Sequence, residues 1–173
     1  TKIKNRPDYE PAFDYWKPLR DNIIATHKNS LEKNSLDDVL LRVSSAKHAN
    51  YRTKIDAYKT WWGRKSFTWF EPETCLFSEN EVDIHVNPEA GLSFGGKNFL
   101  IKLYFKPEEL TKRKSEIILL LMNLALSSQF PNATMAVLDI QNQKLFDKVT
   151  NTNNLQKALK GEISYIAATW NSL

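Results

Sequence analysis

The sequence predicts a layered, mixed α/β domain, and three observations support this prediction. In the first third of the chain, apolar residues recur at three- and four-residue spacing, as in helices packed on a core. The middle of the chain is divided into short stretches rich in β-branched and aromatic residues, as in strands. A long apolar run of helical character then precedes another strand-like run, so helices cover a sheet that continues beyond them.

One domain is expected over residues 1–173, with a helical part at 1–65, a sheet and a buried helix at 66–150, and a C-terminal helix at 151–173. The chain has 173 residues, of which 42% are hydrophobic and 12% are aromatic. A globular domain of this size buries roughly 70% of the surface that its unfolded chain exposes. No internal repeat or low-complexity linker divides the sequence.

Three helices are expected in residues 1–65. Pro18 either kinks the first, at residues 11–28, or opens its second half. Ser35 can cap a short second helix, and Gly63 can end a third helix that begins near residue 47. The apolar stripe predicted for the third helix consists of Tyr51, Ile55, Tyr58 and Trp62.

Short strands are expected at residues 66–70, at 74–78 and within 81–106. These stretches are separated by turn-forming residues, in the sequences EPE and SENE. Their order predicts an antiparallel meander.

The dipeptide Gly95-Gly96 fixes the expected register of the last two strands. A two-residue hairpin turn at these glycines places Phe94 opposite Lys97, and each later pair steps back by one residue. One face of the hairpin is then apolar, and we expect it to lie beneath the apolar helix at residues 117–126. This face collects Val82, Ile84, Val86, Ala90, Leu92, Phe99, Ile101, Leu103 and Phe105.

The other face of the hairpin carries polar residues in the same register. Glu89 lies opposite Lys102, and His85 opposite Lys106. The Glu89–Lys102 pair is either an ordinary surface ion pair, worth about 0.2–1 kcal/mol, or a site. The second interpretation rests on Lys102, which lies in a strand that is otherwise nearly all apolar.

The remaining elements complete a layered sheet. Pro107 and the glutamates after it mark the start of a helix whose apolar residues surround its axis at 117–126. Residues 134–140 are apolar on both faces except at Asp139, as in an inner strand covered on two sides. A closing helix is expected at 155–170.

The order of these elements and two short motifs resemble the αβββαβ core of PD-(D/E)XK nuclease-like proteins. The motifs are NPEAGL on one strand and FLIKLYF on the next, and the resemblance covers roughly residues 66–140. In that family, acids on these two strands bind Mg²⁺ and a lysine helps to position the water that hydrolyses a phosphodiester. The resemblance implies that Pro88-Glu89 supplies the first acid and that Lys102 is the lysine.

The sequence departs from the family pattern at Leu100, where the family has Asp or Glu. Some relatives are thought to move this acid to the following helix, and Glu116 is the candidate here. A nuclease would therefore use Glu89, Lys102 and Glu116 as catalytic residues, with Mg²⁺ bound by the two glutamates. If the chain is not a nuclease, no cofactor is expected.

Positive charge is concentrated in the helical part. Residues 1–65 hold 14 Lys and Arg against 8 Asp and Glu, a net charge of +6, and the rest of the chain carries −2. The excess indicates either an anionic partner or a solvated face. Arg64 and Lys65 follow Trp61 and Trp62, a composition that suits base stacking and phosphate binding. The helical spacing places Trp62 in the core and leaves Trp61 as the one that can be exposed.

A second basic cluster lies near the start of the buried helix, where the helix dipole disfavours cations. Either neighbouring glutamates neutralise it or an anion binds there. The cluster consists of Lys112, Arg113 and Lys114.

Three functional hypotheses follow. The first is a non-catalytic, nuclease-like domain that binds nucleic acid or a protein partner; the second is the Mg²⁺-dependent nuclease; the third is an interaction subunit without a nucleic-acid role. No phosphate-binding glycine loop, nucleophile elbow or set of zinc-binding cysteines is present, which disfavours kinases, Rossmann enzymes, serine hydrolases and zinc proteins. The single Cys75 and the lack of an apolar run of roughly 20 residues predict a cytoplasmic protein with no membrane span.

Overall fold

The computed structural model describes residues 14–150 and 152–171 and confirms the α/β class. The helices are α1 (Lys17–Lys28), the 3₁₀ segments η2 (Lys33–Leu41) and η3 (Ser45–Lys47), α2 (His48–Trp62), α3 (Lys112–Leu126) and α4 (Thr152–Asn171). The strands are β1 (Thr68–Phe70), β2 (Cys75–Glu79), β3 (Val82–Val86), β4 (Ala90–Phe94), β5 (Lys97–Tyr104), β6 (Ala133–Asp139) and β7 (Lys144–Phe146).

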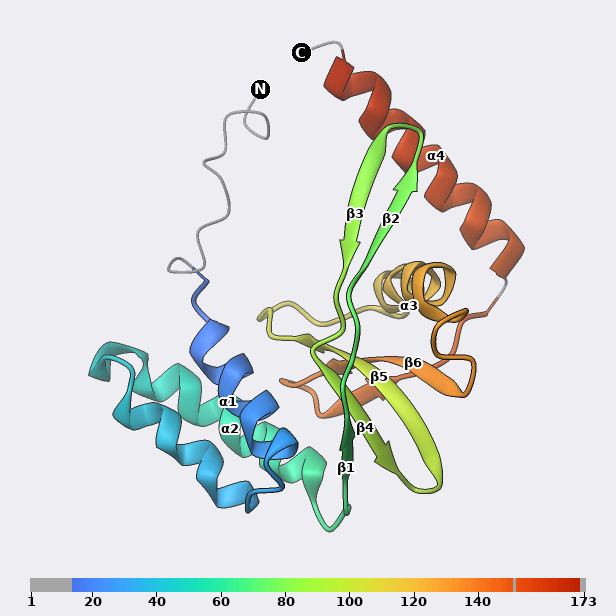
Figure 1. The fold of residues 1–173 in the computed structure, drawn as a ribbon. Coiled ribbons are helices and arrows are strands. Elements are labelled where there is room, and N and C mark those ends of the chain that lie inside the picture. Colours follow the sequence, from blue (N-terminus) through green and yellow to red (C-terminus); the bar gives the residue numbers. More distant parts are fainter. Residues whose placement is uncertain (1–13, 151, 172–173) are drawn as a thin grey trace.

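Five strands form the main sheet, in the order β1-β4-β5-β6-β7. Strands β1, β4 and β5 are antiparallel, whereas β6 runs parallel to β5 and is reached through helix α3. The order α2, β1, β4, β5, α3, β6 follows the helix–strand–strand–strand–helix–strand pattern, but the predicted antiparallel meander of consecutive strands is wrong, because β1 pairs with β4 and not with β2. The hairpin β2–β3 is inserted between β1 and β4 and forms a separate two-stranded sheet that extends away from the main one (Figure 1).

The predicted register of the hairpin β4–β5 is confirmed. Phe94 pairs with Lys97 and Ala90 with Ile101, and both turn glycines have positive φ angles of 57° and 75°. This conformation is favourable for glycine and is required by the two-residue turn.

The predicted continuation of the β4–β5 pairing towards residue 82 is wrong. Residues 82–86 pair with β2, so His85 lies opposite Leu76 and not opposite Lys106. Pro88 separates the two segments, and since proline has no N–H group it cannot continue the ladder of hydrogen bonds. The chain therefore changes sheets at this point.

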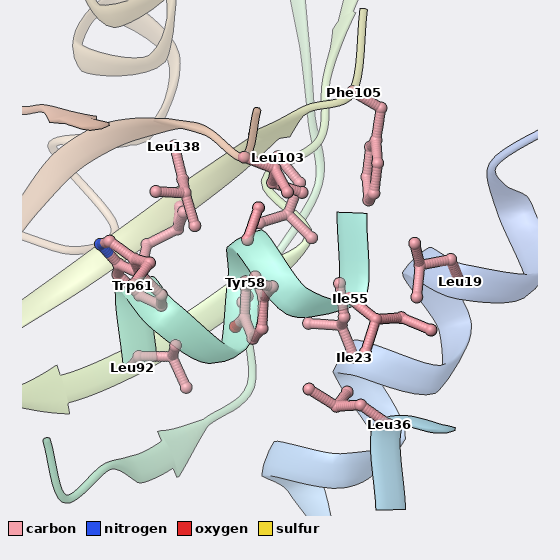
Figure 2. Packing of buried hydrophobic residues seen from close by; sticks show 14 of the residues in the cluster. Leu19, Ile23, Leu36, Ile55, Tyr58, Trp61, Leu92, Leu103, Phe105 and Leu138 are labelled. Carbon is pink, nitrogen blue, oxygen red and sulfur yellow. The ribbon is translucent and has the colours of Figure 1, made fainter. Parts of the chain in front are cut away.

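The apolar face of β5 is buried as predicted, but a different layer covers it. Phe99, Ile101 and Leu103 pack against α1 and α2, and not beneath α3. Figure 2 shows Leu103 beside α2. Helix α3 lies on the other face of the sheet, which carries Leu100 and Val137. Both faces of β5 carry buried apolar residues, so the hydrophobic pattern alone did not determine which helix covers which face.

A third cluster joins α4 to the rest of the fold. Its buried members are Leu120 of α3 and Leu155, Leu159 and Ile163 of α4, with hairpin β2–β3 packed against them. In residues 14–150 and 152–171, no helix is long and apolar enough to cross a bilayer.

Candidate functional site

The predicted pair of Glu89 and Lys102 is present where strand β4 separates from β5. On the β4 side, the ladder of hydrogen bonds to β5 begins at Glu89, directly after Pro88 in the chain. Glu89 Oε2 accepts a hydrogen bond from the Leu103 N–H at 2.8 Å, so the carboxylate replaces a carbonyl group of the missing strand. Glu89 Oε1 accepts from Lys102 Nζ at 2.7 Å. The glutamate thus satisfies both a backbone donor and a charged side chain at the sheet edge.

The ammonium group of Lys102 is fully used in this arrangement. It also donates to the backbone oxygen and to the side-chain oxygen of Asn87, both at 2.9 Å. An ammonium group has three donors, and these two bonds and the bond to Glu89 occupy them all. The Glu89 side chain is 8% exposed, and Arg20 Nε lies 3.6 Å from its Oε1. The geometry therefore favours an ion pair that stabilises the sheet edge over a lysine free to act on a substrate.

Glu116 has contacts of a different kind. It is buried, and its Oε1 accepts a hydrogen bond from the Thr150 N–H at 3.0 Å. Hydrogen bonds from the Thr150 side chain and backbone hold the pKa of Glu116 below its usual value, with a smaller contribution from Lys112, 3.8 Å away. This glutamate fastens the segment after β7 to α3.

The glutamates predicted to share a Mg²⁺ ion are not brought together into a metal site. None of the contacts of Glu116 involves Glu89 or Lys102. In the part of the chain that the structure describes, no group of three or more His, Cys, Asp and Glu side chains could hold a metal ion. Because Mg²⁺ is generally held by carboxylates together with water, Glu89 alone is a poor anchor.

The predicted cations Arg64 and Lys65 line an open groove of about 360 Å³ between the ends of α1 and α2. Lys33, at the start of η2, lines the same groove. Aromatic rings of Trp62 and Phe67 form part of the wall. We call this the basic groove. Sequence reasoning missed Lys33, because it lies some thirty residues before Arg64 and only the tertiary fold brings the two together.

The lysines of the basic groove cap the last turn of α2. Lys33 Nζ donates to the Gly63 carbonyl at 3.0 Å, and Lys65 Nζ donates to the Trp61 carbonyl. Carbonyl groups at a helix C-terminus lack partners within the helix and attract cations. Each ammonium retains two further donors. Arg64 is exposed and forms no ion pair with any residue that the structure describes.

The expected roles of the two adjacent tryptophans are reversed. Trp61 is buried, 7% exposed, and its ring stacks on Phe67 with centroids 5.5 Å apart. Trp62 is half-buried, stacks on His27 at 4.4 Å and donates from Nε1 to the Lys65 carbonyl. Both residues continue the apolar stripe of α2, at three and four residues beyond Tyr58, and the position of Phe67 decides which one is covered. Trp62 is therefore the indole that a ligand in the groove can reach.

The second basic cluster is separate from the basic groove. Lys112, Arg113 and Lys114 are all exposed in the first turn of α3, on the other side of the sheet from α2 (Figure 1). The Thr111 side chain caps this helix by accepting from the Lys114 N–H at 3.3 Å. Glu116 lies near Lys112, as in the interpretation that neighbouring glutamates neutralise the cluster.

No family model matches the chain, and no curated protein or solved structure is detectably similar to it.

Proposed function

We propose that the chain is a non-catalytic α/β domain that binds single-stranded nucleic acid in the basic groove. The observation that carries this proposal is the convergence of Lys33, Arg64 and Lys65 around one groove beside the half-buried ring of Trp62. Cations bind the phosphate backbone, and an aromatic ring offers a surface for one base. One carboxylate, Glu32, lines the same groove.

The distribution of ion pairs supports a partner at this groove. Elsewhere in the helical part, several cations are matched by acids, as in Lys17–Asp21 at 2.5 Å and Arg52–Asp37 at 2.9 Å. Three cations that form no ion pair with any described residue, Lys33, Arg64 and Lys65, meet at this groove. A local excess of positive charge attracts polyanions and releases counterions when they bind.

The closed network around Lys102 supports the non-catalytic part of the proposal. The core order and the contact of Glu89 with Lys102 suit a nuclease-like architecture, as the resemblance implies. Leu100 occupies the family's second acidic position and is fully buried under α3. We infer a domain that has the architecture of a nuclease but lacks the second acid of its metal site.

Binding of a labelled oligonucleotide tests the proposal. Fluorescence anisotropy at low salt compares the wild-type protein with an Arg64→Ser/Lys65→Ser variant and with a control that has the same charge change, Lys148→Ser/Lys157→Ser. Both control lysines are exposed, outside the groove lining. We expect the affinity of the groove variant to fall by a factor of at least about ten, a loss of at least about 1.4 kcal/mol. The control should bind as the wild type does.

The same experiment distinguishes the alternatives. A duplex of the same sequence should bind more weakly than the single strand, because its bases are not free to stack on Trp62. If the wild-type protein binds no nucleic acid at low salt, the proposal is wrong and the protein-partner hypothesis replaces it. Equal losses in the two double variants would indicate binding without a defined site.

A further inference from the structure

A second cavity, of about 270 Å³, lies on the other half of helix α2 from the basic groove. It lies beyond the carboxyl ends of the two parallel strands. Two of its lining residues show this: Phe105 directly follows β5, and Gln141 is the second residue after β6. In open α/β sheets, ligands generally bind outside the carboxyl ends of the strands. We call this the Lys54 cavity. The remaining lining residues are Trp16, Asn50, Thr53, Lys54 and Pro107.

Lys54 is the unusual residue of this cavity. It is only 5% exposed, and its ammonium nitrogen is buried with no hydrogen-bond partner among the described residues. A buried charged group without a partner is costly, so such groups are normally paired. Burial lowers the pKa of Lys54, and the negative charge of Asp139 opposes that change.

Asp139 does not accept a hydrogen bond from Lys54. Its two carboxylate oxygens accept from the Leu110 N–H at 3.2 Å and from the backbone and side chain of Asn142 at 3.2 and 2.9 Å. Asp139 therefore ties together the segments that follow β5 and β6. Its charge acts on Lys54 from a distance, and the ammonium still lacks an acceptor.

The walls of the Lys54 cavity combine flat aromatic surface with polar groups. The rings of Trp16 and Phe105 stack with centroids 5.5 Å apart and an interplanar angle of 16°, and Trp16 also stacks on Tyr51 at 5.3 Å. Lys54 Nζ lies 5.8 Å from the centre of the Trp16 ring, a cation–π distance that gives partial compensation for its burial. Asn50 and Thr53, four residues and one residue before Lys54 on the exposed side of α2, add polar atoms to the rim.

We propose that the Lys54 cavity binds a small ligand of the mononucleotide class, in which a phosphate group accepts hydrogen bonds from Lys54 and a flat heterocycle packs beside Trp16. A lysine binds phosphate as a compact point charge, and its three donors suit the phosphate oxygens. The cavity is slightly below the roughly 300–1,000 Å³ of sites for drug-sized ligands, which limits the ligand to about one nucleotide. This site is distinct from the basic groove and does not depend on the function proposed for it.

Calorimetric titration with AMP, adenosine and inorganic phosphate tests this proposal. The wild-type protein is compared with Lys54→Met, which keeps the apolar stem of the side chain and removes the ammonium. We expect AMP to bind the wild type at least tenfold more tightly than it binds Lys54→Met, and at least tenfold more tightly than adenosine binds the wild type. Inorganic phosphate should bind more weakly than AMP, because it has no ring for the aromatic wall.

The Arg64→Ser/Lys65→Ser variant is the control that separates the two sites. It should bind AMP as the wild type does, because its changes lie in the basic groove. Loss of AMP binding in this variant but not in Lys54→Met would assign the nucleotide to the basic groove and overturn the proposal. Absence of AMP binding to the wild type would also overturn it. Since Lys54→Met removes a buried unpartnered charge, its melting temperature should equal or exceed that of the wild type; if it does not fold, Lys54→Gln replaces it.

Discussion

At the scale of single residues, Glu89 has a structural role that the paired strands alone would not reveal. Its carboxylate completes the hydrogen bonding of β5 beyond the end of β4, through the Leu103 N–H and Lys102. A buried donor that loses its acceptor costs about 1–3 kcal/mol. We therefore expect Glu89→Ala to lower the free energy of unfolding by about that amount, since it removes the acceptor of two donors.

Matched substitutions separate the two contacts of Glu89. Lys102→Ala should cost less than Glu89→Ala, because the Leu103 N–H keeps its acceptor. Glu89→Gln should fall between them, since the amide oxygen can still accept one hydrogen bond. Urea denaturation measures all three variants. An equal or greater cost for Lys102→Ala would show that the lysine, and not the carboxylate, holds this edge.

His27 predicts how the stability of the protein depends on pH. It is 4% exposed, its Nε2 is paired with the Tyr58 hydroxyl at 2.7 Å, and burial lowers its pKa from 6.5 to about 4. Between these values the unfolded chain binds the proton that the folded protein excludes. The contribution of His27 is therefore fully present above pH 6.5 and is lost as the pH falls towards 4, by up to about 1.4 kcal/mol per pH unit.

Urea denaturation between pH 7 and pH 4.5 tests the role of His27. In His27→Gln, the decrease in stability over this range should be smaller than in the wild type by the contribution of one histidine. The rings packed around it, of Tyr58, Trp62 and Phe67, do not change charge in this range. Parallel pH profiles for the two proteins would mean that His27 takes up its proton in the folded state.

At the scale of elements, the junction of β1 and β4 depends on a close approach at one glycine. A Cβ atom added to Gly91 would lie 2.3 Å from the Phe70 carbonyl oxygen, in the strand that pairs with it. Such a contact forces the strands apart, so Gly91→Ala should cost about 1–3 kcal/mol or more. Gly161, inside α4, has nothing within 4 Å of its added Cβ.

Gly161→Ala is the matched control for this substitution. Alanine is favoured over glycine in a helix interior by about 0.5–1 kcal/mol, so this variant should gain stability. Thermal and urea denaturation measure both changes. A neutral effect of Gly91→Ala would contradict the close packing of β1 on β4.

The elements that the sequence predicted well are those set by local chemistry. The Gly95-Gly96 turn fixes the register of β4 and β5 without help from the rest of the chain. The strand that pairs with residues 82–86, before Pro88, depends on a segment outside the hairpin, and so does the helix that covers each face of β5. The pattern of apolar residues did not determine either. In α2, Lys54 lies three residues after Tyr51, on the apolar stripe that runs to Tyr58. This position in the sequence already indicated a buried lysine.

At the scale of the whole molecule, the sequence predicted the pair Glu89–Lys102. It did not predict that Asn87 would occupy the remaining donors of Lys102. Asn87, which occupies two donors of Lys102, lies in the connection between two sheets, where no register could be inferred. The basic groove likewise requires the ends of two helices to meet. The candidate sites therefore depend on tertiary structure more than the core does.

A nuclease-like order of elements without a complete set of metal-binding acids gives a prediction for the purified protein. It should not cleave single- or double-stranded DNA or RNA with Mg²⁺ or Mn²⁺, because Leu100 removes one acid and Glu116 is bound to Thr150. The assay compares the wild type with Lys102→Ala and Glu89→Ala across a series of metals. Metal-dependent cleavage that both substitutions abolish would establish the nuclease hypothesis, whereas cleavage that survives both would indicate a contaminant.

The salt dependence of oligonucleotide binding tests the central claim most directly. For single strands, the logarithm of the binding constant falls with the logarithm of salt concentration by about 0.7 for each phosphate contact. We predict that the Arg64→Ser/Lys65→Ser variant reduces the steepness of this slope by about 1.4, whereas Lys148→Ser/Lys157→Ser leaves it unchanged. Equal slopes for the wild type and the groove variant, or binding that does not respond to salt, would contradict the assignment of nucleic-acid binding to the basic groove.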